Sequence, residues 1–274
     1  MDSLTTTDAL GRRVELPGEP RRIVSLVPSI TETLFAFGLG ERVAGVTRFC
    51  VEPAADVAQK EKIGGTKNVD VQRTLALEPD LVIANVEENE RRDIEKLQGA
   101  GVPVFVTYPR TVAQGIQMMR DVAALTGTEA AAEPFIADAE AELAVAVAAN
   151  ETRAPLRVFC PIWRNPWLTI GPDTYMHDFL AVCGGRNVFA NRTVRYPQVT
   201  LLETARKGPQ VILLPDEPYR FGQKHVAEFE VYAQVPAVLD KRIYLLDGKL
   251  LCWYGHRIAG SLRSVQALLH GGGG

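Results

Sequence analysis

Aromatic and arginine side chains gather in five short segments, each in an expected loop between a strand and a helix. The segments contain Arg48 and Phe49; Trp163, Arg164 and Trp167; Arg195 and Tyr196; Tyr219, Arg220 and Phe221; and Trp253 and Tyr254. Flat rings can stack on a large planar ligand, and arginines can pair with its carboxylates or phosphates. In open α/β sheets, ligands bind beyond the carboxyl ends of the strands. We therefore predict a binding site, against the alternative that these rings fill loop cores or rest on the surface.

Motifs that would indicate catalysis are missing from the sequence. It contains no nucleophile elbow, no phosphate-binding P-loop and no protein-kinase signature. Gly38 and Gly40 look like the start of a dinucleotide fingerprint, but they follow a helix and the third glycine is absent. Adjacent Asp216 and Glu217 are expected in a solvated turn, and Cys160 is expected to be a buried thiol. We therefore expect no enzyme activity.

The cysteines and histidines indicate neither a metal site nor a covalently bound cofactor. They form no C-x-x-C or H-E-x-x-H pair. They are Cys50, Cys160, Cys183 and Cys252, and His177, His225, His256 and His270. We expect buried or half-buried thiols and no structural disulfide.

Composition and charge restrict the class of protein further. The 274 residues are 46% hydrophobic and 23% charged, which is typical of a globular chain. The net charge of −3 argues against nucleic-acid binding, and no apolar run is long enough to cross a bilayer. The first residues lack the basic start and apolar core of a secretory signal. If Met1 is the native start, a cytoplasmic location is expected; the alternative is that a signal has been removed.

The elements that must position these side chains alternate between strands and helices. In the first half, strands are expected at residues 23–27, 42–47, 81–84 and 103–107, and helices from 29 and at 87–98 and 112–125. Pro28 is expected to end the first strand, and Ser29 to Glu32 to form a capping box on the helix that follows. This alternation predicts a parallel α/β sheet.

The middle of the chain interrupts the alternation. Residues 128–151 are rich in Ala and Glu, which are strong helix formers, so one long helix is expected. The second half then has strands expected at 157–162, 168–170, 211–214 and 242–246, and helices at 174–183, 200–206, 224–232 and 256–269. The predicted fold class is α/β: two Rossmann-like lobes, residues 1–127 and 153–274, joined by a bridging helix at residues 128–152.

Three segments carry a family resemblance: residues 22–32 (RIVSLVPSITE), 76–83 (ALEPDLVI) and 183–189 (CGGRNVF). They resemble the helical-backbone metal receptors, which are the class III substrate-binding proteins of ABC importers for cobalamin, haem and ferric siderophores. Residues 196–199 (YPQV) look like the W-P-Q-V segment of the cobalamin-binding member. The resemblance covers about residues 20 to 268.

The resemblance implies two α/β lobes bridged by one long helix, with the ligand cleft between the lobes and little closure on binding. It also implies a periplasmic or other extracytoplasmic location, and we expect a monomer. By position, Phe49, Tyr196 and Trp253 resemble aromatic residues that line the cleft in the cobalamin-binding member, with Trp163 or Trp167 as a further ring. The full predicted ligand-binding set is Pro28, Ser29, Arg48, Phe49, Trp163, Arg164, Trp167, Arg195, Tyr196, Trp253 and Tyr254.

Two features depart from the family's pattern. Importer subunits dock to the permease through one surface glutamate on each lobe, and the matching positions here hold Gln72 and Leu202, with Glu203 adjacent. The cobalamin-binding member pairs its C-G-G cysteine with a cysteine in the last helix, and residues 256–270 contain none. Coupling to an ABC permease is therefore expected to be weak or absent, as would suit a cytoplasmic binder.

The leading hypothesis is a non-enzymatic substrate-binding protein for cobalamin or a similar metal chelate, associated with ABC-type uptake. One alternative is a ferric-siderophore or haem binder, which Arg48, Arg164, Arg195 and Arg220 would favour if the ligand is anionic. Another is a cytoplasmic ligand sensor that kept the fold without transporter docking. A metallocluster protein would need several convergent thiolates, and four scattered cysteines do not offer them.

Overall fold

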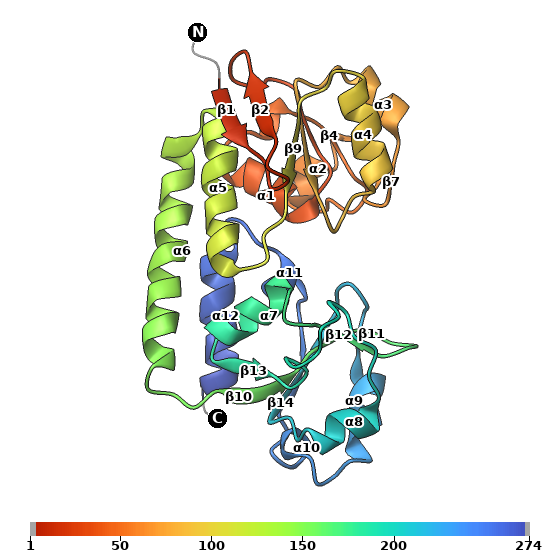
Figure 1. Ribbon diagram of the computed structural model, residues 1–274, viewed down its shortest axis with the longest axis vertical. Coiled ribbons are helices and arrows are strands. Elements are labelled where there is room, and N and C mark those ends of the chain that lie inside the picture. Colours follow the sequence, from red (N-terminus) through yellow and green to blue (C-terminus); the bar gives the residue numbers. More distant parts are fainter. Residues whose placement is uncertain (1–3, 272–274) are drawn as a thin grey trace. The chain divides into compact units, whose positions relative to one another are not determined.

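The computed structural model describes residues 4–271 and divides into two compact units (Figure 1). Unit 1 comprises Met1–Pro109, Gln114–Asp138 and Tyr254–His256; unit 2 comprises Arg110–Ala113, Ala139–Trp253 and Arg257–Gly274. Each unit contains its own parallel sheet, which confirms the predicted α/β class with two lobes. Met1, on which the expectation about the native start depends, lies outside the described residues.

Five parallel strands form the main sheet of unit 1, in the order β5-β4-β3-β8-β9. They are β3 (Ile23–Ser25), β4 (Val43–Val46), β5 (Glu61–Lys62), β8 (Leu81–Asn85) and β9 (Val104–Thr107). Strands β3, β8 and β9 are buried along their whole length, which explains their near-continuous apolar runs. Leu26, Ile63, Val82 and Val104 belong to the core that forms on this sheet.

Two antiparallel pairs in unit 1 lie outside the sequence prediction. They are β1 (Leu4–Thr7) with β2 (Arg13–Leu16), and β6 (Gly64–Gly65) with β7 (Asn68–Val69). The first pair is closed by the buried carboxylate of Asp8, which accepts hydrogen bonds from the Leu10 and Arg12 N–H groups at 2.9 Å each. A single aspartate holds this turn and shows no periodic pattern. The alternation of strands and helices in the sequence therefore does not predict the hairpin.

The helices of the first half are α1 (Pro28–Ala36), the 3₁₀ turn η1 (Gly40–Arg42), α2 (Ala54–Val57), α3 (Val71–Ala76), α4 (Arg91–Gly99) and α5 (Val112–Thr126). The predicted capping box at Ser29 is wrong. Helix α1 begins at Pro28, whose fixed φ and missing N–H suit the first helical position, and no side chain caps it. Strand β3 accordingly ends at Ser25, two residues before the predicted end, because the chain must turn into this helix.

Helix α4 begins at Arg91, four residues after the predicted start at residue 87. The side-chain oxygen of Asn85 accepts hydrogen bonds from the Glu87 and Glu88 N–H groups at 2.8 and 3.2 Å, which holds the intervening residues in a turn. This local bond competes with helix formation, as asparagine side chains commonly do.

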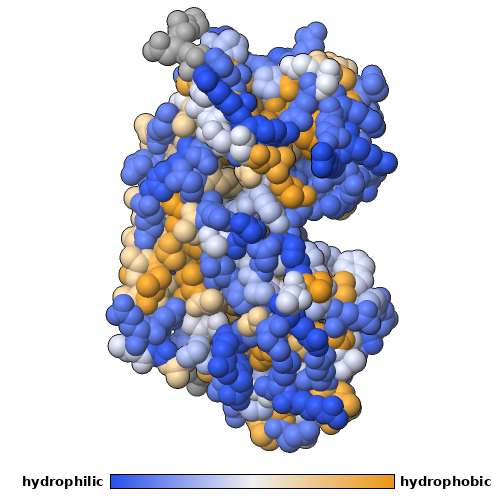
Figure 2. Space-filling view, viewed as in Figure 1, coloured by the Kyte–Doolittle hydropathy of each residue, from blue (hydrophilic) through white to orange (hydrophobic). Residues whose placement is uncertain are grey.

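The predicted long helix is present as α6 (Glu129–Asn150), which runs from unit 1 into unit 2. Pro134 lies inside it without ending it. Figure 2 shows apolar surface along the second part of this helix, where Val145 and Val147 are exposed. No other helix within residues 4–271 is as long, and none has the length and apolar character required to span a membrane.

Four parallel strands form the main sheet of unit 2, in the order β13-β10-β14-β15. They are β10 (Leu156–Phe159), β13 (Gly185–Asn187), β14 (Val211–Pro215) and β15 (Ile243–Leu246). The single strand predicted at residues 157–162 is wrong, because β10 ends at Phe159. The chain continues as β11 (Pro161–Trp163), which pairs antiparallel with β12 (Leu168–Thr169) in a separate hairpin. Pro161 has no N–H for the ladder of a central strand, which accounts for the break.

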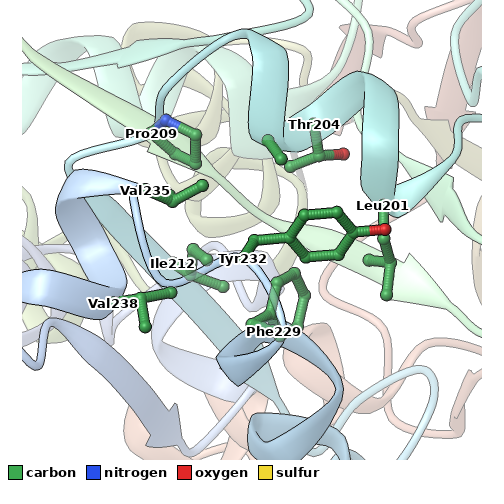
Figure 3. A pocket seen from close by; sticks show the side chains of 9 residues that line it. Leu201, Thr204, Pro209, Ile212, Phe229, Tyr232, Val235 and Val238 are labelled. Atoms are coloured by element: carbon green, nitrogen blue, oxygen red, sulfur yellow. The ribbon is translucent and has the colours of Figure 1, made fainter.

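The helices of unit 2 are α7 (Tyr175–Val182), α8 (Leu201–Arg206), α9 (Gln223–Glu230), α10 (Pro236–Leu239), α11 (Lys249–Cys252) and α12 (Ile258–His270). Thr174 and Thr200 cap α7 and α8 by accepting from backbone N–H groups of the first turn. Figure 3 shows Phe229, Tyr232 and Val235 gathered around Ile212 of β14. This apolar packing holds the last turn of α9 and the residues after it, and α9 carries two of the side chains described next.

Candidate functional site

An aromatic cluster in unit 2 follows the carboxyl end of β14. The loop after β14 carries Tyr219 and Phe221, and the β11–β12 hairpin carries Trp163 and Trp167. The Trp167 ring stacks on Phe221 with centroids 5.7 Å apart and planes inclined by 11°, and Trp163 meets Tyr219 edge-on at 5.5 Å. The structure therefore brings two of the five predicted segments together. Because Trp163 is 43% exposed, the cluster presents an open ring on its surface.

Arg164 is paired inside this cluster. Its Nε donates to Glu228 Oε1 at 2.8 Å and its Nη2 donates to Glu228 Oε2 at 2.7 Å, which is a two-point guanidinium–carboxylate pair. The guanidinium carbon also lies 5.6 Å from the centre of the Trp167 ring. Hydrogen bonding to Glu228 raises the pKa of Arg164. The positive charge that Arg164 offers to an anionic ligand is thus largely compensated by Glu228.

The first turn of α9 adds a histidine to the same cluster. His225 is buried, and its ring lies edge-on to Tyr219 and Phe221 at 5.5 and 5.3 Å. Burial lowers the pKa of His225. Sequence reasoning missed both His225 and Glu228. Their spacing of three residues on one helix is the only signal, and many surface helices share it.

Arg195 and Tyr196 lie on a segment beside β12. The Thr169 N–H donates to Pro197 O at 3.1 Å, and the Val199 N–H donates to Trp167 O at 3.0 Å. Arg195 Nη1 lies 2.6 Å from Asp173 Oδ2, and this bond lowers the pKa of Asp173. The Arg195 guanidinium also lies 5.7 Å from the ring centre of Tyr196, which is exposed. Tyr196 is therefore a second open ring in unit 2, next to a paired arginine.

Trp253 occupies a different environment from the predicted open ring. The short helix α11 separates it from β15, and it is only 7% exposed. Its Nε1 donates to Glu217 Oε2 at 3.0 Å, and the Lys249 ammonium lies 5.2 Å from the ring centre. Burial raises the pKa of Glu217. This tryptophan anchors the end of α11 to the loop after β14.

In unit 1, Pro28 and Ser29 are buried in the first turn of α1. The neighbouring Thr31 hydroxyl lies in a polar cluster around Cys50, 2.8 Å from Ser25 Oγ and 3.1 Å from Cys50 Sγ. Burial raises the pKa of the Cys50 thiol. These residues hold the start of the helix against the end of β4, and the Ser29 side chain presents little surface.

Arg48 and Phe49 are the exposed members of the predicted set in unit 1. Phe49 is 49% exposed, and the Arg48 guanidinium lies 5.0 Å from its ring centre. The Arg48 N–H donates to Gly64 O at 2.8 Å, which holds the segment against the β6–β7 turn. A Cβ on Gly65 would stand 3.2 Å from both side chains, so the absence of a side chain there gives them room.

Tyr254 belongs to unit 1 and is buried. Its hydroxyl accepts from Asn85 Nδ2 at 2.7 Å, and the same amide group donates to Thr107 Oγ1 at 3.1 Å. The next residue, Gly255, has φ +107°, and a Cβ there would stand 2.2 Å from Thr33 Oγ1. Tyr254 therefore fastens this segment to the carboxyl end of β8, and Gly255 lets the backbone lie close to Thr33 of α1.

Metal-binding side chains do not converge anywhere in the described part of the chain, where no three His, Cys, Asp or Glu residues form a candidate group. Cys50, Cys160 and Cys183 are buried and Cys252 is partly buried, as predicted for the thiols, and the structure joins none of these four in a disulfide. Burial raises the pKa of Cys160 to about 12, so this thiol is a poor nucleophile.

The two positions predicted to replace docking glutamates have equivalent local settings. Gln72 is the second residue of α3, after the capping Asp70, and Leu202 is the second residue of α8, after the capping Thr200. Both side chains are exposed. Glu203 is engaged elsewhere in unit 2, because its carboxylate pairs with Arg192.

Comparisons with known proteins agree with this architecture. The sequence profile described as "Periplasmic binding protein" matches residues 23–250. A vitamin B12-binding protein of Vibrio parahaemolyticus is 28% identical over 238 residues, which cover 85% of this chain and 83% of that protein. Together with the structural likeness below, these matches confirm the family resemblance of the sequence.

Two solved structures share the fold. The periplasmic vitamin B12 binding protein BtuF of Vibrio cholerae matches with a TM-score of 0.81 at 23% identity, over 92% of this chain and 98% of that one. The periplasmic haem-binding protein RhuT from Roseiflexus sp. RS-1 matches with a TM-score of 0.79 at 26% identity, over 93% and 99%.

Proposed function

We propose that this chain, which belongs to the periplasmic binding protein family, binds cobalamin or a similar metal chelate in association with ABC-type uptake. The family consists of binding proteins, which confirms the expectation of a non-enzymatic protein. Relatives named for vitamin B12 and for haem support a metal chelate as the class of ligand.

The observation that carries this proposal is the open aromatic surface of unit 2. Trp163 and Tyr196 offer exposed rings, and Trp163 is backed by Tyr219 at 5.5 Å. A flat corrin or porphyrin can lie against such rings, because aromatic side chains combine large apolar area with little conformational freedom to lose. In unit 1, Phe49 with Arg48 offers a smaller surface of the same kind. We propose that both sets contact ligand.

The charges of the cluster favour a ligand with little net negative charge. Arg164 is paired with Glu228, and Arg195 with Asp173. An anionic siderophore would have to compete with these carboxylates for each guanidinium. Cobalamin, whose rim carries neutral amides, would not need to. Ferric siderophores and haem are therefore the second choice for this chain.

Coupling to a permease is proposed to be weak. Gln72 and Leu202 carry no charge, so neither offers the carboxylate of a charge-assisted contact. An uptake or pull-down assay with a cobalamin permease is expected near background for the wild-type chain, and Gln72→Glu together with Leu202→Glu should raise the signal. Tight binding by the unaltered chain would contradict this part of the proposal.

The test of the ligand is an equilibrium titration of the purified protein, followed by visible absorption, with cyanocobalamin, haemin and a ferric hydroxamate siderophore. We expect saturable binding of one chelate per chain, with cyanocobalamin the tightest. If the siderophore binds most tightly, the ligand class is ferric siderophores and not cobalamin. Absence of saturable binding for all three would refute it.

A further inference from the structure

One hydrogen bond fixes the state of the His225 ring. The Gly222 N–H donates to His225 Nδ1 at 2.9 Å, so Nδ1 is the nitrogen without a proton. The neutral ring must then carry its proton on Nε2. His225 is 2% exposed, and its pKa is lowered by burial and, to a smaller degree, by the charge of Lys224. His225 is therefore neutral at pH 7.

The other groups around this ring are compatible with the neutral form. Arg164 opposes a second positive charge, and Glu228 favours one but is already paired with Arg164. A doubly protonated ring would also direct its Nδ1 proton at the Gly222 N–H, with loss of that hydrogen bond. Phe221 adds only a ring edge, and Tyr219 adds a ring edge and its hydroxyl.

The state of His225 determines the hydrogen bonding of Tyr219. His225 Nε2 lies 3.3 Å from Tyr219 Oη, and a protonated Nε2 donates to that oxygen. The hydroxyl therefore accepts from the histidine, and its own proton must point elsewhere. The Tyr219 side chain is partly exposed and lies against the open Trp163 ring.

We propose that Tyr219 contacts the bound ligand as a hydrogen-bond donor, and that His225 is the positioning residue that keeps this proton directed outward. The partner on the ligand would be an acceptor oxygen, such as an amide carbonyl on the rim of a chelate. This inference rests on the proposed function, because it assumes that the Trp163 surface meets ligand.

The test compares dissociation constants for cyanocobalamin, measured by visible absorption at pH 7. Tyr219→Phe keeps the ring and removes the donor, so binding should weaken about three- to tenfold. His225→Phe releases the hydroxyl without removing it, so a loss of about two- to threefold is expected. His225→Gln keeps an N–H donor near the Nε2 position and should restore most of the affinity. A merely structural histidine would not be rescued in this way.

Tyr232→Phe is the matched control. This tyrosine lines the apolar pocket around Ile212 (Figure 3), and His225, Tyr219 and Trp163 do not line that pocket. Its loss of a hydroxyl should leave the dissociation constant unchanged. Nitrogen NMR of the His225 ring supplies a readout that needs no ligand, and the proton is expected on Nε2 at pH 7.

The outcomes separate this inference from the proposed function. If wild-type protein binds cyanocobalamin and Tyr219→Phe binds equally well, the inference fails and the proposed function stands. A proton on His225 Nδ1 would also overturn the positioning role. If wild-type protein binds none of cyanocobalamin, haemin and ferric hydroxamate, the proposed function fails and this inference fails with it.

Discussion

The carboxyl ends of the two parallel sheets carry different chemistry. At the carboxyl end of β8 in unit 1, buried neutral side chains form hydrogen bonds with one another. Asn85 donates to both Thr107 and Tyr254. Beyond β14 in unit 2, the chain presents rings and an ion pair, with Trp163 exposed and Arg164 held by Glu228. The same architecture thus uses one set of loops mainly to hold the backbone and the other mainly to form surface.

The difference separates buried polar residues from exposed aromatic rings. A buried amide that makes several hydrogen bonds contributes to stability, because leaving its partners unsatisfied is costly. An exposed ring contributes little to stability and much to binding, because its burial is completed only by the ligand. Substitution of the buried amide in unit 1 should therefore act mainly on unfolding, and substitution of the exposed ring in unit 2 mainly on affinity.

The largest effect is expected for Asn85→Leu. The variant loses the bonds to Tyr254, Thr107 and the N–H groups of Glu87 and Glu88. The free energy of unfolding should fall by about 3 kcal/mol, measured by urea denaturation. Asn191→Leu, at an exposed position, is the control and should change stability by less than about 0.5 kcal/mol. Equal effects of the two variants would remove the distinction drawn for unit 1.

Trp163→Ala should have the next largest effect, on affinity rather than stability. Loss of a ring that the ligand covers should cost about 1–3 kcal/mol of binding free energy, measured by titration with cyanocobalamin. Phe49→Ala in unit 1 should cost less, since its ring is smaller. A larger loss from Phe49→Ala would show that unit 1 supplies the main ligand surface and would reverse the comparison.

A smaller effect is expected from Glu228→Gln, which releases the Arg164 charge. Haemin, with two carboxylates, should then bind about threefold tighter at low salt, and cyanocobalamin should change little. The gain should fade at high ionic strength because the charge is partly exposed. Glu230→Gln, on the exposed side of the same helix, is the control. Equal gains for both ligands would show that Arg164 does not act through charge.

The smallest expected effect is on the pH dependence of stability through Glu217. Burial raises its folded-state pKa above the ordinary value of 4.5. The folded state therefore binds this proton more tightly than the unfolded state does. The ionised carboxylate costs stability above the folded pKa, and that cost is removed as pH falls toward 4.5.

Glu217→Gln keeps an oxygen acceptor for Trp253 Nε1 and removes this titration. As pH falls from 7 to 4, the free energy of unfolding of wild-type protein should rise relative to that of the variant, measured by urea denaturation at both values. A relative loss over the same interval would mean that the bond from Trp253 outweighs burial.

Much of the fold follows from the sequence because its signals are local. Buried strands such as β8 and β14 are continuous apolar runs, and the Ala- and Glu-rich run forms α6. The errors lie where one residue decides: Pro28 begins a helix, and Pro161 ends the ladder of β10. Such positions depend on which backbone groups need partners, and periodicity does not show that.

The candidate site was harder to predict because its members meet only after folding. Trp253 and Tyr254 look like ligand-facing rings in the sequence, yet Glu217 and Asn85 hold them as buried anchors. Glu228 reaches Arg164 from 64 residues away, so no spacing rule links them. Residue type indicated which side chains could meet a planar ligand, and only the packing shows which remain open.

Oxidative footprinting of the protein, with and without saturating cyanocobalamin, tests the central claim most directly. Trp163 should become strongly protected and Phe49 protected to a smaller extent, while the exposed Val145 and Val147 of α6 should be unchanged. Unchanged oxidation of Trp163 at saturation would contradict the account, since the ligand would then lie away from the aromatic surface of unit 2.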